Sequence, residues 1–113
     1  MALDIEAALV AWLSANTGWH VSTDVPNPRP NRLATVERTG GGVTSVVVDN
    51  PTVAIQCWAN TRAEAAEMAC IVRDMMPSFA YEAGILGVEV NSVANFPATD
   101  SPRYQLVVNI RTR

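Results

Sequence analysis

The chain has 113 residues, which is the size of a single domain, and hydrophobic residues make up 49% of it, which excludes a disordered protein. Its 8 basic residues, all arginine, stand against 11 acidic ones, and the net charge of −3 predicts no basic surface for a nucleic acid. Charged residues are only 17% of the chain, against about 25% in typical soluble domains, so we expect part of the surface to face other protein.

Residues 4–16 are predicted to form an amphipathic helix, with Asp4 as its N-cap and Gly18 as its stop. At a helical repeat, the apolar residues fall on one face: Ile5, Ala8, Leu9, Trp12 and Leu13. The opposite face carries small residues instead of charges: Ala7, Ala11 and Ser14. A helix that faces water more often carries Glu and Lys there, so this face is a candidate contact with a neighbouring protein.

The next segments predict β-strands joined by turns. Residues 19–25 alternate in polarity, as a half-buried strand does. The three prolines of residues 26–31 then fix a stiff, extended connection to a second strand over residues 32–39. Gly40-Gly41-Gly42 is predicted to be the tip of a hairpin, because glycines permit a tight reversal.

Residues 44–48 can return from that tip as the hairpin partner. Asp49-Asn50-Pro51 is a turn signal that leads into a strand over residues 52–59. The two faces of that strand are Val53, Ile55 and Cys57 on one side and Ala54, Gln56 and Trp58 on the other.

The second helix, over residues 61–76, has the clearest start signal. Thr61-Arg62-Ala63-Glu64 fits a capping box, in which the hydroxyl and the carboxylate each satisfy a free backbone donor. Pro77 ends the helix near Met76. Two further strands are expected over residues 88–93 and 103–111. The core stripe of the helix is Ala65, Met68, Ala69, Val72, Met75 and Met76, flanked by Ile71.

The element order is therefore α-β-β-β-α-β-β, within one domain over residues 1–113. Two helices of this length can cover one face of a four- to five-stranded, mostly antiparallel sheet. We therefore predict an α+β fold, a two-layer sandwich with both helices on one face. The other face of the sheet is expected to be open in a monomer.

The residue types predict no active site. His20, the one histidine, accompanies neither a nucleophile elbow nor an H-E-x-x-H motif, so we interpret it as a surface or interface residue. Cys57 and Cys70 lack C-x-x-C spacing and are expected to be reduced thiols, with Cys57 in the core. We expect no enzyme, no cofactor and no metal site.

Other patterns favour structural roles. Gly40-Gly41-Gly42 lacks the phosphate-loop pattern and lies between strands, which favours a turn over a phosphate cradle. No apolar run reaches the ~18 residues of a membrane span, and a basic signal-peptide start is missing. No carboxylate pair has a spacing that indicates acid–base catalysis. The carboxylates considered are Asp49, Asp74, Glu89 and Asp100.

Three segments together resemble the tail terminator, or tail completion, proteins of bacteriophages with long, non-contractile tails. The first is the proline-rich link with its following strand, Pro26 to Gly42. The second is Val53 to Ala59, which runs into the alanine-rich helix, and the third is the ending Asp100 to Arg111. The resemblance covers nearly the whole chain in element order.

This resemblance implies a structural virion protein that assembles as a homo-oligomer, a hexameric ring on the head-proximal end of the tail tube. Such a ring ends tube polymerisation and presents a surface to the head–tail connector. It implies no catalytic residues. Genomic DNA would pass through the ring without sequence-specific binding, which a mildly acidic chain suits because a basic lumen would retain phosphates. The expected location is the virion tail, after assembly in the host cytoplasm.

Two alternatives remain open. A neck or head–tail connector protein has a similar size and ring assembly but a different contact partner. From a different class, a small ferredoxin-like ligand-binding regulatory domain can also place two helices on one sheet. Such a domain usually follows a βαβ-βαβ order, however, whereas this chain opens with a helix and three successive strands.

The candidate functional residues are those of protein interfaces. The stiff loop and the glycines qualify because prolines reduce the ordering cost of binding and arginines donate to carboxylates. The open sheet face is expected to leave an apolar patch exposed in a monomer, and the second helix has a stripe of small residues. The full set is Pro28, Arg29, Pro30, Arg32, Gly40, Gly41, Gly42, Trp58, Ala63, Ala66, Cys70 and Val107.

Overall fold

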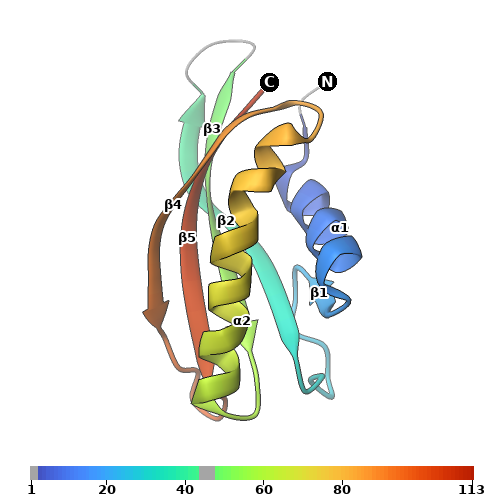
Figure 1. The fold of residues 1–113 in the computed structure, drawn as a ribbon, viewed down its shortest axis with the longest axis vertical. Coiled ribbons are helices and arrows are strands. Elements are labelled where there is room, and N and C mark those ends of the chain that lie inside the picture. Colours follow the sequence, from blue (N-terminus) through green and yellow to red (C-terminus); the bar gives the residue numbers. More distant parts are fainter. Residues whose placement is uncertain (1–2, 44–47) are drawn as a thin grey trace.

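The computed structural model describes residues 3–43 and 48–113, and these form two α-helices, a 3-10 helix and five strands (Figure 1). Their bounds in chain order are α1 (Ile5–Thr17), β1 (His20–Ser22), β2 (Leu33–Val43), β3 (Asp49–Trp58), α2 (Arg62–Met75), η1 (Met76–Tyr81), β4 (Ile85–Asn95) and β5 (Arg103–Thr112).

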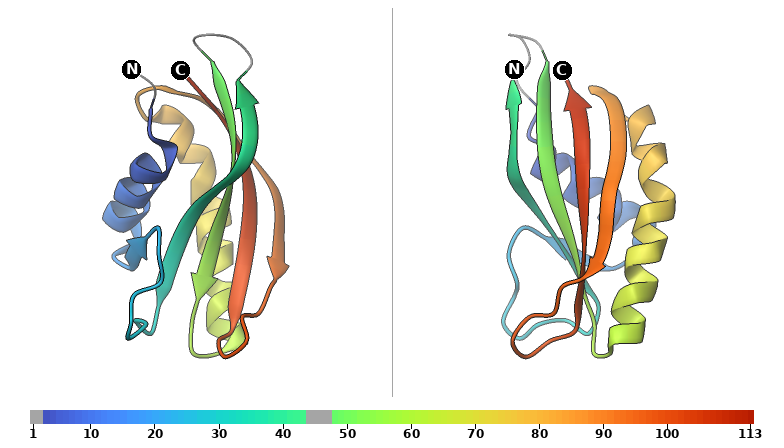
Figure 2. Two further views of the ribbon diagram at one scale, coloured as in Figure 1. Left: turned by 180° about the vertical axis from the view of Figure 1, so that it is seen from behind. Right: turned by 90° about the vertical axis from the view of Figure 1, so that its left-hand side faces the viewer.

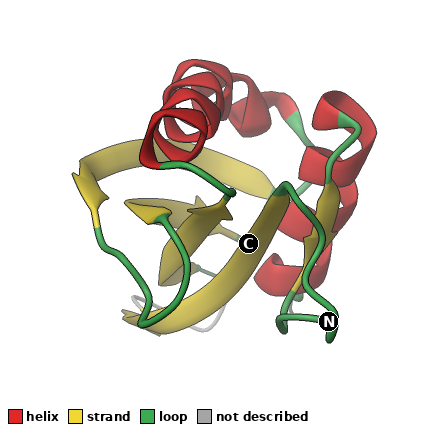
Figure 3. Ribbon diagram, turned by 90° about the horizontal axis from the view of Figure 1, so that it is seen from below, coloured by secondary structure: helices red, strands yellow, loops and turns green. Residues whose placement is uncertain are grey.

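The five strands form one twisted sheet in the order β1-β2-β3-β5-β4. β1 pairs with β2 in parallel, and every other pair of neighbours is antiparallel. Both helices pack on the same side of this sheet (Figure 2, Figure 3). The predicted two-layer α+β sandwich and its element order are therefore confirmed.

Local signals set the ends of both helices as predicted. The Asp4 carboxylate accepts a hydrogen bond from the Ala7 amide at 3.1 Å and caps α1. At the other end Gly18 adopts a left-handed conformation, with φ 74°, and donates its N–H to the Ser14 carbonyl. The Thr61 hydroxyl accepts from the Glu64 amide at 3.1 Å and caps the start of α2, whereas the Glu64 carboxylate accepts from the Thr61 hydroxyl at 3.3 Å and not from the backbone donor that the capping box predicted.

The core lies between the helices and the sheet. Val53, Ile55 and Cys57 of β3 belong to it, which confirms the predicted inward face of this strand. Two residues at the edge of the predicted core stripe of α2 are more exposed than predicted. Met75 is half-buried and Ile71 is exposed. Fully buried side chains from the helices and η1 are Leu9, Leu13, Ala65, Met68, Ala69, Val72, Met76 and Phe79.

The two edge strands differ from their predicted ranges in length. β1 covers only three residues, because its parallel partner segment is limited to Leu33–Thr35. β4 is longer than predicted and begins at Ile85, since its exposed residues break the expected alternation while the backbone still pairs with β5. The segment predicted as a plain connection after Met76 is the 3-10 helix η1.

The predicted hairpin tip at the three glycines is wrong. Gly40, Gly41 and Gly42 lie within β2 and pair with Thr52, Pro51 and Asn50 of β3. The predicted turn at residues 49–51 is likewise wrong, because these residues begin β3. Glycine suits a close antiparallel pairing as well as a turn, and the cross-strand pairing decides between them here. The predicted returning strand over residues 44–48 falls mainly on residues 44–47, outside the described part.

Gly41 occupies the position with the least space. Its φ is 93°, and a Cβ built on it would lie 2.0 Å from the Asn50 carbonyl oxygen. We predict that Gly41→Ala destabilises the protein by roughly 2 kcal/mol or more, since the alanine is strained and clashes with backbone. Gly40→Ala and Gly42→Ala meet open space and should change the free energy of unfolding by less than about 1 kcal/mol. Equal effects in denaturant unfolding would contradict this assignment.

Candidate interaction surfaces

The single histidine and the two cysteines do not form a reactive site. His20 is exposed on β1 and Cys70 is exposed on α2. Cys57 is buried in the core, and burial raises the pKa of its thiol to about 12, which keeps it protonated and unreactive. Within residues 3–43 and 48–113, no three His, Cys, Asp or Glu side chains group so as to hold a metal ion. No helix in this described part is long and apolar enough to cross a membrane.

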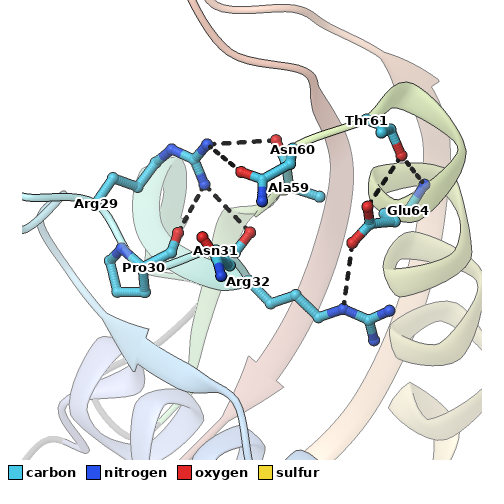
Figure 4. A network of polar contacts seen from close by, with 8 residues as sticks. All are labelled: Arg29, Pro30, Asn31, Arg32, Ala59, Asn60, Thr61 and Glu64. Atoms are coloured by element: carbon cyan, nitrogen blue, oxygen red, sulfur yellow. Dashed lines mark hydrogen bonds and ion pairs between the residues drawn. The ribbon is translucent and has the colours of Figure 1, made fainter.

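The proline-rich loop before β2 is tied to the end of β3 by Arg29 (Figure 4). Nη1 of Arg29 donates to the carbonyl oxygens of Pro30 at 2.7 Å and Asn31 at 3.3 Å. Nη2 donates to the Ala59 carbonyl and to Oδ1 of Asn60, each at 3.4 Å. The sequence predicts that this guanidinium binds a carboxylate of a partner, but in the structure both of its terminal nitrogens donate within the chain.

Arg32 is the more available cation of this loop. Its Nε lies 3.7 Å from a Glu64 carboxylate oxygen, and both side chains are more than a third exposed. The same carboxylate accepts from the Thr61 hydroxyl at 3.3 Å, so the loop meets the first turn of α2 here (Figure 4). An exposed pair of this kind contributes about 0–1 kcal/mol, which leaves Arg32 able to exchange Glu64 for a partner carboxylate. Pro28 is exposed and Pro30 is half-buried in the same loop.

The sheet face away from the helices carries a polar ladder across three strands. The Thr35 hydroxyl of β2 donates to Gln56 of β3 at 3.2 Å, and Gln56 donates to Gln105 of β5 at 3.0 Å. Two pairs along on the same face, beyond Ala54 and Val107, Thr52 donates to Asn109 at 3.0 Å. These cross-strand bonds satisfy the polar groups of the face without a partner protein, so the face is stable in an isolated chain.

Trp58 lies on this open face, as predicted, but it is not exposed there. Only 9% of the residue is accessible in the single chain. Its indole N–H donates to the Thr35 hydroxyl at 3.1 Å, and the Arg103 guanidinium lies 4.8 Å from the ring centroid. Arg103 also lies 4.7 Å from the Phe96 ring, so the cation sits between two aromatic rings. The prediction that a monomer leaves Trp58 wet is therefore wrong.

The rest of the predicted apolar patch is small. Val107 is half-buried, and Ala54 is buried beside it in the sheet register. Arg103 completes this region, where its guanidinium covers the Trp58 ring, and it is not among the residues predicted from the sequence. In the sequence, Arg103 is visible only as an arginine at the start of the last predicted strand. The pairing of β3 with β5, which sets Arg103 opposite Trp58, is what brings the guanidinium to the indole ring.

The outer face of α1 is charge-poor, as the sequence predicted, whereas α2 exposes its small residues among the charged Arg62, Glu67, Arg73 and Asp74. Ala63 and Cys70 of α2 are exposed and Ala66 is half-buried, while the small residues of α1 are exposed as well. An open groove of about 500 Å³ runs between α1 and η1. Tyr81, which ends η1, is 90% exposed. The groove is lined by Ala8, Ala11, Trp12, Ala15, Asn16, Phe79, Glu82, Ala83 and Ile85.

The sequence was compared with models of known protein families and with curated proteins, and neither comparison gives a match.

Trp58 is predicted to stabilise the monomer. Trp58→Ala should lower the free energy of unfolding by about 3–5 kcal/mol, as truncation of a buried aromatic does. Trp58→Phe should cost less, because it keeps a ring under Arg103 and loses the indole hydrogen bond to Thr35. The control is Phe96→Ala, which removes a half-exposed ring on the other side of Arg103 and should cost less than either. Denaturant unfolding that shows no loss for Trp58→Ala would contradict this role.

Substitutions of Arg29 and Arg32 are predicted to have different effects, the first on the stability of the monomer and the second on self-association. Arg29→Ala should cost roughly 1–2 kcal/mol of stability, because it releases the loop from Ala59 and Asn60. Arg29→Lys should recover little, since an ammonium lacks the planar fork. Arg32→Ala should change unfolding by less than about 1 kcal/mol and yet weaken self-association, which sizing at several concentrations measures. If the Arg32→Ala variant self-associates as the wild type does, the assignment of this loop to the interface is wrong.

Proposed function

We propose that this chain is a tail terminator protein of a bacteriophage with a long, non-contractile tail. In this proposal it forms a ring on the head-proximal end of the tail tube, ends tube polymerisation and joins the tail to the head connector. Support comes from the resemblance of its three segments and from the α-β-β-β-α-β-β order, with two helices on one face of a five-stranded sheet.

The observation that carries the proposal is the uncharged outer surface of α1, together with the small residues exposed among charged ones on α2. The exposed side of α1 presents Ala7, Ala11 and Ser14, and that of α2 presents Ala63 and Cys70. Helices that face only water usually carry charged residues at such positions. Depletion of charge is a feature of the centre of protein interfaces, which supports a protein that works by contact with other protein.

The electrostatic balance supports a ring through which DNA moves. With a net charge of −3 the chain does not offer the excess of cations that neutralises phosphates. A hexamer of such subunits would carry genomic DNA through its centre without sequence-specific binding. The partners in this proposal are copies of the chain itself, the tail tube protein and the head–tail connector proteins, within the virion tail. The proposal requires neither a cofactor nor catalysis.

A neck or head–tail connector protein is the nearest alternative, because it would share the ring and the small-residue surface of α1. The regulatory-domain alternative has less support. A ferredoxin-like domain is built from two βαβ units, whereas here three strands precede α2 and the last two strands follow it.

Contact with tail tubes separates these alternatives. We expect the purified chain to run as a monomer or a hexamer in sizing, and to cap one end of tubes assembled from the tail tube protein of the same phage. Tubes grown in its presence should be shorter, because a capped end adds no further subunits. Electron microscopy of tube ends and tube lengths is the measurement, with Arg32→Ala as a variant of weakened association. Binding to the connector without any effect on tubes would favour the neck protein.

A further inference from the structure

The two outer edges of the sheet differ in how they are protected. β1 pairs only with Leu33–Thr35, so in the described part of the chain β2 has no strand on its outer side from Val36 onward. β4 forms the other edge, and register shifts between Ile85 and Gly87 and between Val90 and Ser92 interrupt it. An unpaired edge offers backbone donors and acceptors to a strand of another chain, and proteins commonly block it.

A carboxylate from α1 occupies an outward amide of β2. The backbone N–H of Arg38 donates to Oε2 of Glu6 at 2.9 Å. Glu6 lies in the first turn of α1, which Asp4 caps through the Ala7 amide. A hydrogen bond from an amide to a carboxylate is charge-assisted and stronger than one between neutral groups. A strand added to β2 would need the donor that Glu6 now holds.

The side chain of Arg38 fixes that donor in place. Its Nη1 and Nη2 donate to the two carboxylate oxygens of Asp49, at 2.7 and 2.9 Å, and Nε donates to the Gly40 carbonyl at 3.1 Å. The hydrogen bond to Arg38 holds the pKa of Asp49 below its usual value, so the pair is ionised at neutral pH. Arg38 is therefore anchored within the sheet by Asp49 and Gly40, while Glu6 reaches its amide from α1.

We propose that Glu6 guards the outer edge of β2, and that release of the first turn of α1 opens this edge to β4 of a second copy. The inference rests on the proposed self-assembly. Each neighbour along β2, β3, β5 and β4 is antiparallel, so β2 and β4 run in opposite directions. A second copy in the same orientation, as in a cyclic ring, therefore presents β4 antiparallel to β2 and continues the sheet.

The first test removes the guard. Glu6→Ala should raise the hydrogen-exchange rate of the Arg38 amide at least tenfold, which is the loss of one charge-assisted bond. It should also lower the concentration at which the chain self-associates, by at least tenfold in sedimentation velocity. Glu6→Gln keeps an oxygen that can accept and should stay close to the wild type. Glu67→Ala, an exposed glutamate of α2, is the matched control and should change neither quantity.

The second test blocks the proposed partner strand. In the Glu6→Ala background, Asn91→Pro places a proline at the register shift of β4, where an edge tolerates it, and should restore the monomer. If circular dichroism shows that this variant does not fold, Asn91→Lys puts a charge on the same edge instead. Faster exchange at Arg38 without stronger association overturns the proposal, as does association that persists after the β4 substitution. Wild-type capping of tube ends is scored separately, so either proposal can fail alone.

Discussion

The rest of the structure depends on β3, which lies at the centre of the sheet and is packed on both faces. Val53, Ile55 and Cys57 are buried against the helices, while Ala54 and Trp58 are buried on the opposite face. A fully buried apolar side chain contributes roughly 1.5–3 kcal/mol, so this strand concentrates much of the driving force for folding. Its position fixes β2 and β5, and these two strands carry the outer strands β1 and β4.

The end of β3 also gathers the loops that are candidates for partner contact. The Ala59 amide donates to the Pro102 carbonyl at 3.3 Å, which holds the connection between β4 and β5. The Ala59 carbonyl accepts from Arg29, and Thr61 begins α2 two residues later. Because these segments are fixed in the free chain, they would lose little conformational freedom on binding a partner.

The open sheet face and the β2 edge suit a protein that stays unassembled until it meets its partner. The polar ladder through Gln56 lets the open sheet face meet water, and Glu6 holds a donor at the β2 edge. The isolated chain thus bonds the side-chain polar groups of the open face internally and holds one outward amide, that of Arg38, at the β2 edge. In the proposed ring, association exchanges these internal bonds for bonds between subunits, which keeps the net gain small and the assembly reversible.

The sequence by itself determined the helices, the inward face of β3 and the two-layer architecture. Asp4 and Thr61 bond to amides three residues away, so such caps depend on the local sequence alone. Tertiary structure decided the rest. Gly41 is equally compatible with a turn or a strand until Pro51 pairs with it, and Arg103 covers Trp58 only once β3 and β5 are in register. Register is set by the sum of contacts between distant segments, which no local pattern contains.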